Sequence, residues 1–523
     1  MKKTAMIFYT VPSKMYGRMM EMKFDYPESV EQWGILEISL EGRSDGNPFT
    51  DYSVTGDFYG KNEVKRAEGF YDGDGIYKVR FMPSFPGEYT FVISGTGFDG
   101  TAEGKFEVFP ASDKNHGPVR VFNTFHFAYA DGTPYYPVGT TCYAWTHQPE
   151  ETQEKTLRTL EQGYFNKIRF CVFPKHYDFN FADPVTFPYE GTPCDNSSIT
   201  QENFGSYKPD NPENHWDFTR FCPEHFRGME RRIRQLMDLG IEADIIVMHP
   251  YDRWGFSEMS AEDDDRYVHY LIARFAAFRN VWWSLANEYD LMKKSIADWE
   301  RIASIFCEYD PYCRLRSIHN CHAFYDYTAP WITHCCIQRQ DDYKCAELTG
   351  EYRARYRKPV VLDEIAYEGN LPHGWGNISG KELVRRFWES AVRGGYAGHG
   401  ETYFSGGGNI WWSHGGELHG ESQERIRFLH SILQKTPGLG LKPVDLHWDG
   451  ASAAAENGDF YYLIYFGFHR PSYREYDFGP EPYTVEVIDT WEMTSAVLGT
   501  FRGKVRIPLP GKEYMALRIC RPD

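Results

Sequence analysis

Two glutamates stand at the ends of strongly apolar runs. One run is Val-Trp-Trp-Ser-Leu-Ala-Asn-Glu at residues 281–288, and the other is Pro-Val-Val-Leu-Asp-Glu at residues 359–364. Buried strands of a parallel barrel have this texture, and polar residues at their C-terminal ends lie at the mouth, where active sites are built. Two carboxyls at one barrel mouth are the layout of a glycosidase. The hypothesis is that Glu288 and Glu364 cleave a glycosidic bond.

Cleavage of that bond requires two carboxyls in different environments, one neutral proton donor and one ionised group for attack. A retaining pair lies about 5 to 5.5 Å apart, whereas an inverting pair is wider and admits water. Glu401 is the strongest rival carboxylate, because it could position substrate or replace Glu364 as nucleophile. Asp363 would point toward the helices on an ideal strand and is expected to be a structural acceptor.

Other polar residues follow the predicted strands. Arg169 is a charge within an apolar run and needs a partner, either Glu364, which it would keep ionised, or a group across the barrel bottom. Trp411 and Trp412 lie in a glycine-rich loop and predict a stacking platform. A histidine at a strand end serves a structural role as readily as it binds substrate. The remaining candidate lining consists of Trp145, His147, His249, Tyr251, Trp254, His319, His322, Gln338 and Tyr367.

Apolar runs alternate with amphipathic segments from about residue 119 onward, which predicts a (β/α)8 TIM barrel with inserted loops. Eight strand candidates begin at Tyr136, Lys167, Ala243, Val281, Arg314, Trp331, Pro359 and Tyr396. Helices are expected over residues 224–239, 264–278, 347–357, 381–393 and 423–433. On this count Glu288 ends strand four and Glu364 ends strand seven.

The barrel has a strand-rich segment on either side. Apolar and polar residues alternate before Pro110, with turn signals such as Phe-Tyr-Asp-Gly-Asp-Gly from Phe70, which predicts an immunoglobulin-like β-sandwich. Residues 1–12 are expected to be a strand rather than a signal peptide. The expected domains are an N-terminal sandwich at 1–112, the barrel at 113–437 and a C-terminal β-sandwich at 438–523. Such sandwiches either bind glycan or brace the barrel.

Composition excludes several classes of partner. The 523 residues carry a net charge of −18, which argues against nucleic acid and against an anionic membrane surface. No run is long and apolar enough to span a bilayer. The 11 cysteines show neither a disulfide framework nor a zinc spacing, so reduced thiols in a cytoplasm are the simplest account. No cofactor and no metal are expected, since Gly-Thr-Thr-Cys-Tyr-Ala-Trp from Gly139 lacks the His-x-His of a metal-dependent barrel hydrolase.

The strand ends resemble those of a known group of enzymes. Asn287-Glu288 on strand four and Glu364 on strand seven resemble the retaining clan A glycosidases. The segment Gly-Phe-Tyr-Asp-Gly-Asp-Gly-Ile-Tyr-Lys-Val-Arg-Phe-Met-Pro from Gly69, followed by Pro-Gly-Glu-Tyr, looks like the sandwich of unknown function ahead of apiosidase-like barrels. The resemblance implies that Asn287 binds the sugar hydroxyl beside the reacting carbon. Apiosidases carry an aspartate where Glu288 stands, so the resemblance implies the clan's mechanism rather than apiose.

The expected activity is that of a cytoplasmic retaining glycoside hydrolase. By resemblance it acts on small pentose- or furanose-containing glycosides, and homo-oligomers are possible. Exo action is expected because the insert at 174–214 and the long eighth loop, with Ser-Gly-Gly-Gly-Asn at 405–409 as a lid, could wall off the cleft. The alternative is a non-catalytic carbohydrate-binding protein on an inactive barrel.

Overall fold

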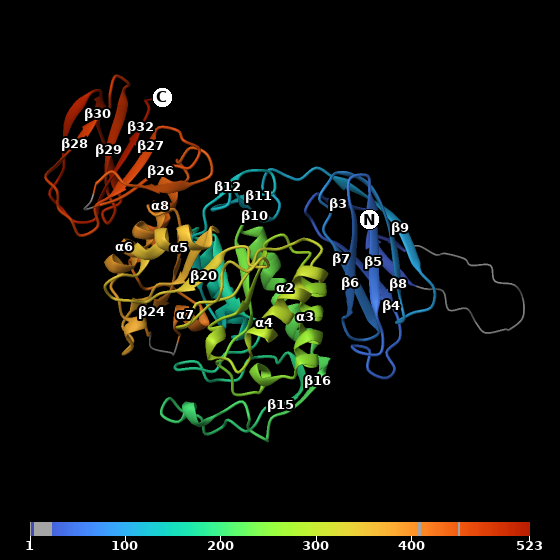
Figure 1. Ribbon diagram of the computed structural model, residues 1–523. Coiled ribbons are helices and arrows are strands. Elements are labelled where there is room, and N and C mark those ends of the chain that lie inside the picture. Colours follow the sequence, from blue (N-terminus) through green and yellow to red (C-terminus); the bar gives the residue numbers. More distant parts are fainter. Residues whose placement is uncertain (1, 5–22, 405–408, 448–449, 523) are drawn as a thin grey trace, which may run out of the picture.

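The computed structural model describes residues 2–4, 23–404, 409–447 and 450–522 (Figure 1). Of the strand expected at residues 1–12, only Lys2–Thr4 lies among the described residues, where it forms β1. The lid expected at residues 405–409 lies outside them except for its last residue.

Eight parallel strands form the central sheet. In chain order they are β13 (Gly139–Thr141), β14 (Lys167–Cys171), β17 (Glu242–Met248), β18 (Val281–Ala286), β19 (Arg316–Ser317), β20 (Cys335–Gln338), β21 (Val360–Glu364) and β23 (Tyr396–His399). Their order in the sheet is β19-β18-β17-β14-β13-β23-β21-β20. An isolated parallel bridge between His319 and Cys336 links the two ends of this order, so the sheet is a nearly closed barrel. The eight predicted strands are therefore confirmed.

Helices follow most of the strands. They are α1 (Glu150–Leu160), α2 (Pro223–Asp238), α3 (Ala261–Phe275), α4 (Ile296–Tyr309), α5 (Thr349–Tyr356), α6 (Gly380–Ala391), α7 (Trp411–His414) and α8 (Ser422–Leu433). Local sequence explains their starts. Proline opens α2, where its missing N–H costs nothing, and Ser295 forms a reciprocal capping box with Asp298 at the start of α4. The five predicted helices correspond to α2, α3, α5, α6 and α8.

The barrel interior contains a charged cluster instead of a purely apolar core. Lys167 on β14 is fully buried, and its Nζ lies 2.6 Å from Asp244 Oδ2 on β17 and 2.7 Å from Asp363 Oδ1 on β21. Strands β14 and β21 are not neighbours in the sheet, so this ion pair crosses the interior. The prediction that Asp363 points toward the helices is therefore wrong. A buried lysine charge without partners would destabilise the fold. The carboxylates of Asp244 and Asp363 together compensate it.

The N-terminal strands pair in one continuous order. They are β2 (Phe24–Pro27), β3 (Ser29–Glu31), β4 (Leu36–Glu41), β5 (Val54–Gly60), β6 (Val64–Tyr71), β7 (Ile76–Phe81), β8 (Gly87–Gly95) and β9 (Ala102–Phe109). Strand β6 joins two sets of strands, because residues 64–68 pair with β5 and residues 69–71 pair with β7. Rings of Phe58 and Phe81 stack with centroids 4.2 Å apart between these sets.

These strands pack against helices α2 and α3 of the barrel (Figure 1). Arg80 on β7 crosses the boundary. Its guanidinium donates to Glu230 Oε1 on α2 at 2.6 Å and to the Arg274 carbonyl on α3 at 2.6 Å. Glu230 also accepts from Arg274 Nε at 2.7 Å. The two parts are thus joined by a buried ionic network as well as by apolar packing.

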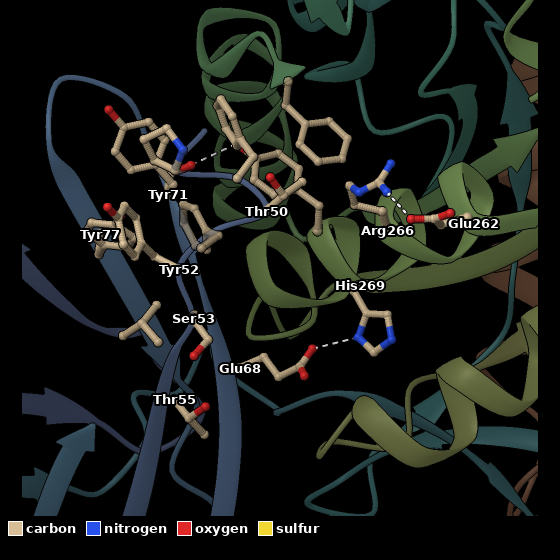
Figure 2. A pocket seen from close by; sticks show the side chains of 17 residues that line it. Thr50, Tyr52, Ser53, Thr55, Glu68, Tyr71, Tyr77, Glu262, Arg266 and His269 are labelled. Atoms are coloured by element: carbon tan, nitrogen blue, oxygen red, sulfur yellow. Dashed lines mark hydrogen bonds and ion pairs between the residues drawn. The ribbon is translucent and has the colours of Figure 1, made fainter. Parts of the chain in front are cut away.

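A cavity of about 450 Å³ lies beside this boundary (Figure 2). Tyrosines from the N-terminal part form one wall, and α3 forms the other. Its carboxylates are already paired, because Glu68 accepts from His269 at 2.8 Å and Glu262 accepts from Arg266 at 3.0 Å (Figure 2). Neither predicted catalytic glutamate contributes to it.

The C-terminal part contains two further sheets. One has the order β25-β26-β27-β32-β29-β30, and the other pairs β28 with β31. The strands are β25 (Leu441–Val444), β26 (Ala451–Ala455), β27 (Tyr461–Tyr465), β28 (Tyr473–Asp477), β29 (Tyr483–Asp489), β30 (Thr494–Phe501), β31 (Lys504–Pro508) and β32 (Met515–Cys520). This part packs on α6, where the rings of Trp388 and Tyr465 stack with centroids 5.4 Å apart.

Short strands complete the molecule. A small antiparallel sheet of β10 (Val119–Phe122), β11 (His126–Tyr129) and β12 (Pro134–Tyr135) leads into the barrel. The hairpin β15 (Tyr189–Thr192) and β16 (His215–Phe221) lies in the insert between β14 and α2. Strands β22 (Glu368–Gly369) and β24 (Glu401–Thr402) pair beyond the ends of β21 and β23.

Candidate active site

Both predicted glutamates line one cavity of about 400 Å³ at the C-terminal ends of the barrel strands. Glu364 is the last residue of β21, and Glu288 lies two residues after β18. Each side chain is only about 5% exposed. The backbone of Glu288 has φ of 51°, a left-handed conformation that is uncommon for a residue with a side chain and is often found at functional sites.

Each glutamate receives a hydrogen bond from a buried tyrosine. The Tyr143 hydroxyl donates to Glu364 Oε1, and the Tyr251 hydroxyl donates to Glu288 Oε2. The Tyr143 hydroxyl also lies 3.2 Å from Asn287 Oδ1. Burial raises the pKa of both phenols well above the ordinary value, and the neighbouring glutamate raises it further. Both hydroxyls therefore remain donors throughout the working pH range.

A buried guanidinium lies beside Glu364 at the base of the cavity. Arg169 pairs with both kinds of partner that the sequence left open: its Nη1 lies 4.0 Å from Glu364 Oε1, and its Nε lies nearer to Asp244 Oδ2 inside the barrel, at 3.5 Å. Arg169 Nη2 lies 3.5 Å from Asn287 Oδ1. Burial, and then the charge of Glu288, raise the pKa of Glu364 to about 7. The guanidinium opposes this shift by favouring the carboxylate. One proton can therefore reside on the pair near neutral pH, as acid-base catalysis requires.

Several predicted substrate-binding residues do line the cavity. They are Tyr251, Asn287, His322, Gln338, Tyr367 and Trp412. Trp412 meets Tyr143 edge to face with centroids 5.7 Å apart and lies 4.9 Å from the ring of Trp375. These rings give the cavity one aromatic wall, the kind of surface on which sugar rings stack.

Gly400 makes room for one part of that wall. A Cβ at Gly400 would stand 2.2 Å from the ring of Tyr367, which is closer than carbon atoms can approach. Only glycine therefore allows the chain after β23 to pass directly behind Tyr367.

Three predicted tryptophans do not reach the cavity. Trp145 packs against Phe170 with centroids 5.8 Å apart, and Trp254 donates from Nε1 to Asp183 at 3.0 Å beneath the long insert. Trp411 donates from Nε1 to Thr140 Oγ1 at 2.8 Å. Consecutive residues of the short helix α7 point in different directions, so Trp411 enters the core while Trp412 faces the cavity.

Three of the four predicted histidines, His147, His249 and His319, are also buried outside the cavity lining. His147 Nε2 is 3.1 Å from the Val172 carbonyl, and His249 Nε2 is 3.1 Å from the Phe173 carbonyl. Burial lowers the pKa of each to about 3, so both rings are neutral. His319 lies beneath Glu364, with Nε2 3.9 Å from Oε1, and burial lowers its pKa well below the ordinary value.

The rival carboxylate Glu401 is held elsewhere. It lies on β24 and accepts backbone N–H groups of His419 at 2.7 Å and Gly420 at 2.8 Å. It is not among the residues that line the cavity. Burial raises its pKa to about 7, and the two hydrogen bonds partly offset that effect. Glu401 therefore holds the backbone of the eighth loop and lies outside the cavity lining.

Sequence reasoning missed seven residues of the lining, namely Tyr143, Lys175, Tyr177, Leu291, Cys321, Gln340 and Trp375. Tyr143 follows the first strand by two residues, so its position after a strand end was the available signal. Lys175 lies on the long insert after β14, where no periodicity constrains side-chain direction. Trp375 and Tyr177 meet with ring centroids 6.4 Å apart, a contact between distant loops.

The long insert is tied to the opposite rim. Asp178 Oδ2 lies 2.6 Å from His373 Nε2 on the loop after β21. Next to this pair, the rings of Phe179 and Phe404 approach with centroids 5.4 Å apart. The insert therefore closes one side of the cavity mouth.

The described residues contain neither a metal-ligand cluster nor a membrane-spanning helix. Among the residues that the structure describes, no group of three or more His, Cys, Asp or Glu is arranged to hold a metal ion. No helix in the described parts of the chain has the length and apolarity to cross a membrane. The cysteines are all free thiols.

Three family models match the chain. Residues 123–455 match the apiosidase-like catalytic domain. Residues 29–96 match a domain of unknown function, DUF5060, and residues 448–520 match another, DUF5605. No curated protein matches the chain.

Solved structures extend this similarity. A putative glycoside hydrolase from Bacteroides vulgatus ATCC 8482 is 38% identical, with 95% of this chain and 100% of that one covered and a TM-score of 0.87. A glycoside hydrolase family 5 structure from the same organism is 13% identical, with 78% and 94% covered and a TM-score of 0.59. The second likeness concerns the fold alone.

Proposed function

Because the chain belongs to the apiosidase-like family and is a glycoside hydrolase, we propose that it works by a retaining double displacement between Glu364 and Glu288. The observation that carries this proposal is that both carboxyls line one cavity at the ends of strands β18 and β21. The predicted positions, fourth and seventh in the barrel, agree with this placement.

In the first step, a Glu364 oxygen bonds to the anomeric carbon while the glycosidic bond breaks. Glu288 gives its proton to the departing oxygen, so the leaving group departs as a neutral alcohol. In the second step, Glu288 removes a proton from water, and the resulting hydroxide displaces Glu364. The enzyme returns to its starting protonation state, and the sugar retains its anomeric configuration.

The neighbours of the pair fit these roles. Arg169 beneath Glu364 favours the ionised nucleophile, and the Tyr143 hydroxyl holds the attacking carboxylate in place. Asn287 has its Oδ1 directed toward Tyr143 and Arg169, which fixes the orientation of its amide group. We assign that amide to the sugar hydroxyl beside the reacting carbon, a contact that strengthens as positive charge develops on the ring.

For the substrate we propose small pentose- or furanose-containing glycosides, cleaved from the non-reducing end, with the cytoplasm as the site of action. The exo mode is supported by the insert that closes one side of the mouth through Asp178 and His373. The small cavity, about 400 Å³, suits one or two sugar rings. The sugar class rests on family membership.

A screen of aryl furanosides and pyranosides tests the proposal. Wild-type enzyme should release the aryl group from at least one of them, and NMR of the first-formed sugar should show retention. Glu364→Ala should lose activity by at least about 10⁴-fold. With azide, Glu364→Ala should yield a glycosyl azide of inverted configuration, whereas Glu288→Ala should yield the retained one.

Two outcomes would reject the proposal. Undiminished cleavage by Glu364→Ala would remove the nucleophile assignment. Sugar binding without hydrolysis of any glycoside would favour the non-catalytic carbohydrate-binding alternative.

A further inference from the structure

Lys175 is a buried cation at the wall of the catalytic cavity. It lies four residues after β14, is 3% exposed, and lines the same cavity as both glutamates. A lysine in such a place is unusual because transfer of an ammonium group from water into a protein interior is costly without compensation.

Aromatic rings provide that compensation. Nζ lies 3.5 Å from the ring centroid of Tyr143, 4.2 Å from that of Tyr251 and 4.7 Å from that of Trp412. Among the described residues, its ammonium forms no ion pair within 4.0 Å and no hydrogen bond. The cation is therefore held by ring faces.

The two nearest rings belong to the tyrosines that hold the glutamates. Tyr143 donates to Glu364, and Tyr251 donates to Glu288. A cation over a phenol ring withdraws electron density, so the hydroxyl becomes a stronger donor. One ammonium group thus acts on Glu364 through Tyr143 and on Glu288 through Tyr251. Its positive charge also acts on both carboxyls directly.

The titratable and charged groups around Nζ come from six strand ends. They are Arg169 and Cys171 on β14, Tyr177 beside Lys175, Tyr143 after β13, His249 and Tyr251 after β17, Glu288 after β18, His319 and Cys321 after β19, and Glu364 and Tyr367 at β21. Burial keeps the histidines, phenols and thiols of this set neutral near pH 7. The remaining charges are those of Arg169, Lys175 and the two glutamates.

We propose that Lys175 is a positioning residue for the reaction: it fixes both tyrosines against the glutamates and favours the ionised form of Glu364. The inference rests on the proposed function. Without this charge, the Glu364 carboxyl would hold its proton to higher pH, and the nucleophile would be neutral over much of the working range. Burial lowers the pKa of Lys175 itself to about 8, so it is charged at neutral pH.

The test measures pH profiles of kcat/KM with a dinitrophenyl glycoside of the sugar that the wild type cleaves. Its leaving group needs no proton, so the acidic limb reports ionisation of the nucleophile alone. Lys175→Met and Lys175→Gln should shift the acidic limb to higher pH by about one unit. At pH values on that limb, kcat/KM should be roughly tenfold lower than that of the wild type. Lys175→Arg should restore the limb, even at reduced kcat. Lys61→Met, at an exposed position in the N-terminal part, is the matched control and should leave the profile unchanged.

The outcomes separate this inference from the proposed function. If the wild type cleaves the glycoside and Glu364→Ala does not, the function stands. An acidic limb at the wild-type pH in both neutral variants would then overturn the role of Lys175, whatever their kcat. Thermal melting identifies any variant that fails to fold, and the other neutral variant then gives the answer. Absence of wild-type cleavage would reject the proposed function itself.

Discussion

Lys167 and Asp363 form a 2.7 Å ion pair across the barrel interior, one residue before Glu364 in the chain. Lys167 thus holds in place the carboxylate of Asp363, which precedes the proposed nucleophile in the chain. Although burial opposes its ionisation, Lys167 and Arg169 hold the pKa of Asp363 below its usual range. The end of β21 is anchored by charge as well as by strand pairing.

This pair should be important for folding. We expect Asp363→Asn to lower the free energy of unfolding by about 3 kcal/mol, because it leaves part of a buried lysine charge uncompensated. Denaturant unfolding checks the value, with the exposed Asp113→Asn as a control. A loss no larger than that of the control would show that Asp244 alone satisfies Lys167.

Removal of the proposed nucleophile should stabilise the protein at neutral and alkaline pH. The folded-state pKa of Glu364 is raised to about 7, so the folded state binds its proton more tightly than the unfolded chain does. The free energy of unfolding therefore falls as pH rises from the pKa of Glu364 in the unfolded chain toward 7, and it stays lower above pH 7. Glu364→Gln lacks this ionisation and should be more stable than wild type by about 1 to 3 kcal/mol at pH 8, with no such gain at pH 4.

Melting curves at both pH values measure this difference, with the exposed Glu103→Gln as the matched substitution. An equal gain at pH 4 and pH 8 would mean that the carboxylate charge is not its cause.

Gly400→Ala should impair catalysis without removing any polar group of the site. The added methyl would meet the Tyr367 ring at 2.2 Å and displace it from the cavity wall. We expect kcat/KM to fall by roughly 10- to 100-fold, since small displacements in a catalytic cavity are costly. Gly205→Ala, whose methyl would meet nothing within 4 Å, is the control and should retain activity. Full activity of Gly400→Ala would show that Tyr367 is dispensable.

The boundary between the N-terminal strands and the barrel should depend on Arg80. We expect Arg80→Met to lower the free energy of unfolding by about 3 kcal/mol, because Glu230 loses one of its two buried guanidinium partners. Exposed Arg66→Met, which breaks a surface pair with Asp57, should cost under about 1 kcal/mol. Urea unfolding curves, with enzyme activity as the probe, give the unfolding free energies of the two variants. Similar values would mean that apolar packing alone joins the parts.

The barrel could be predicted because its signal is local. Runs such as 281–288 are apolar on both faces, so their burial follows from composition, and the carboxylate that ends each run marks the C-terminal edge. The eight strands and five predicted helices follow from such patterns. The placement of Glu288 and Glu364 in one cavity follows in turn, since parallel strands end at the same face.

Side-chain direction beyond the strand ends could not be predicted. Trp411 and Trp412 are adjacent in sequence and identical in type, yet only the second reaches the cavity. The sequence predicts a loop here instead of the short helix α7, so it offers no period that distinguishes the two side chains. The same holds for His147 and His249, whose carbonyl partners come from the neighbouring strand end.

The sequence by itself therefore determined the barrel, the two glutamates and the order of the strands that hold them, because hydrophobic periodicity acts over neighbouring residues. Only the tertiary structure decided that Lys175 lies over Tyr143 and Tyr251, and that Asp363 faces inward to Lys167. These contacts join residues from different strand ends, and their favourable energy exists only once the barrel brings those ends together.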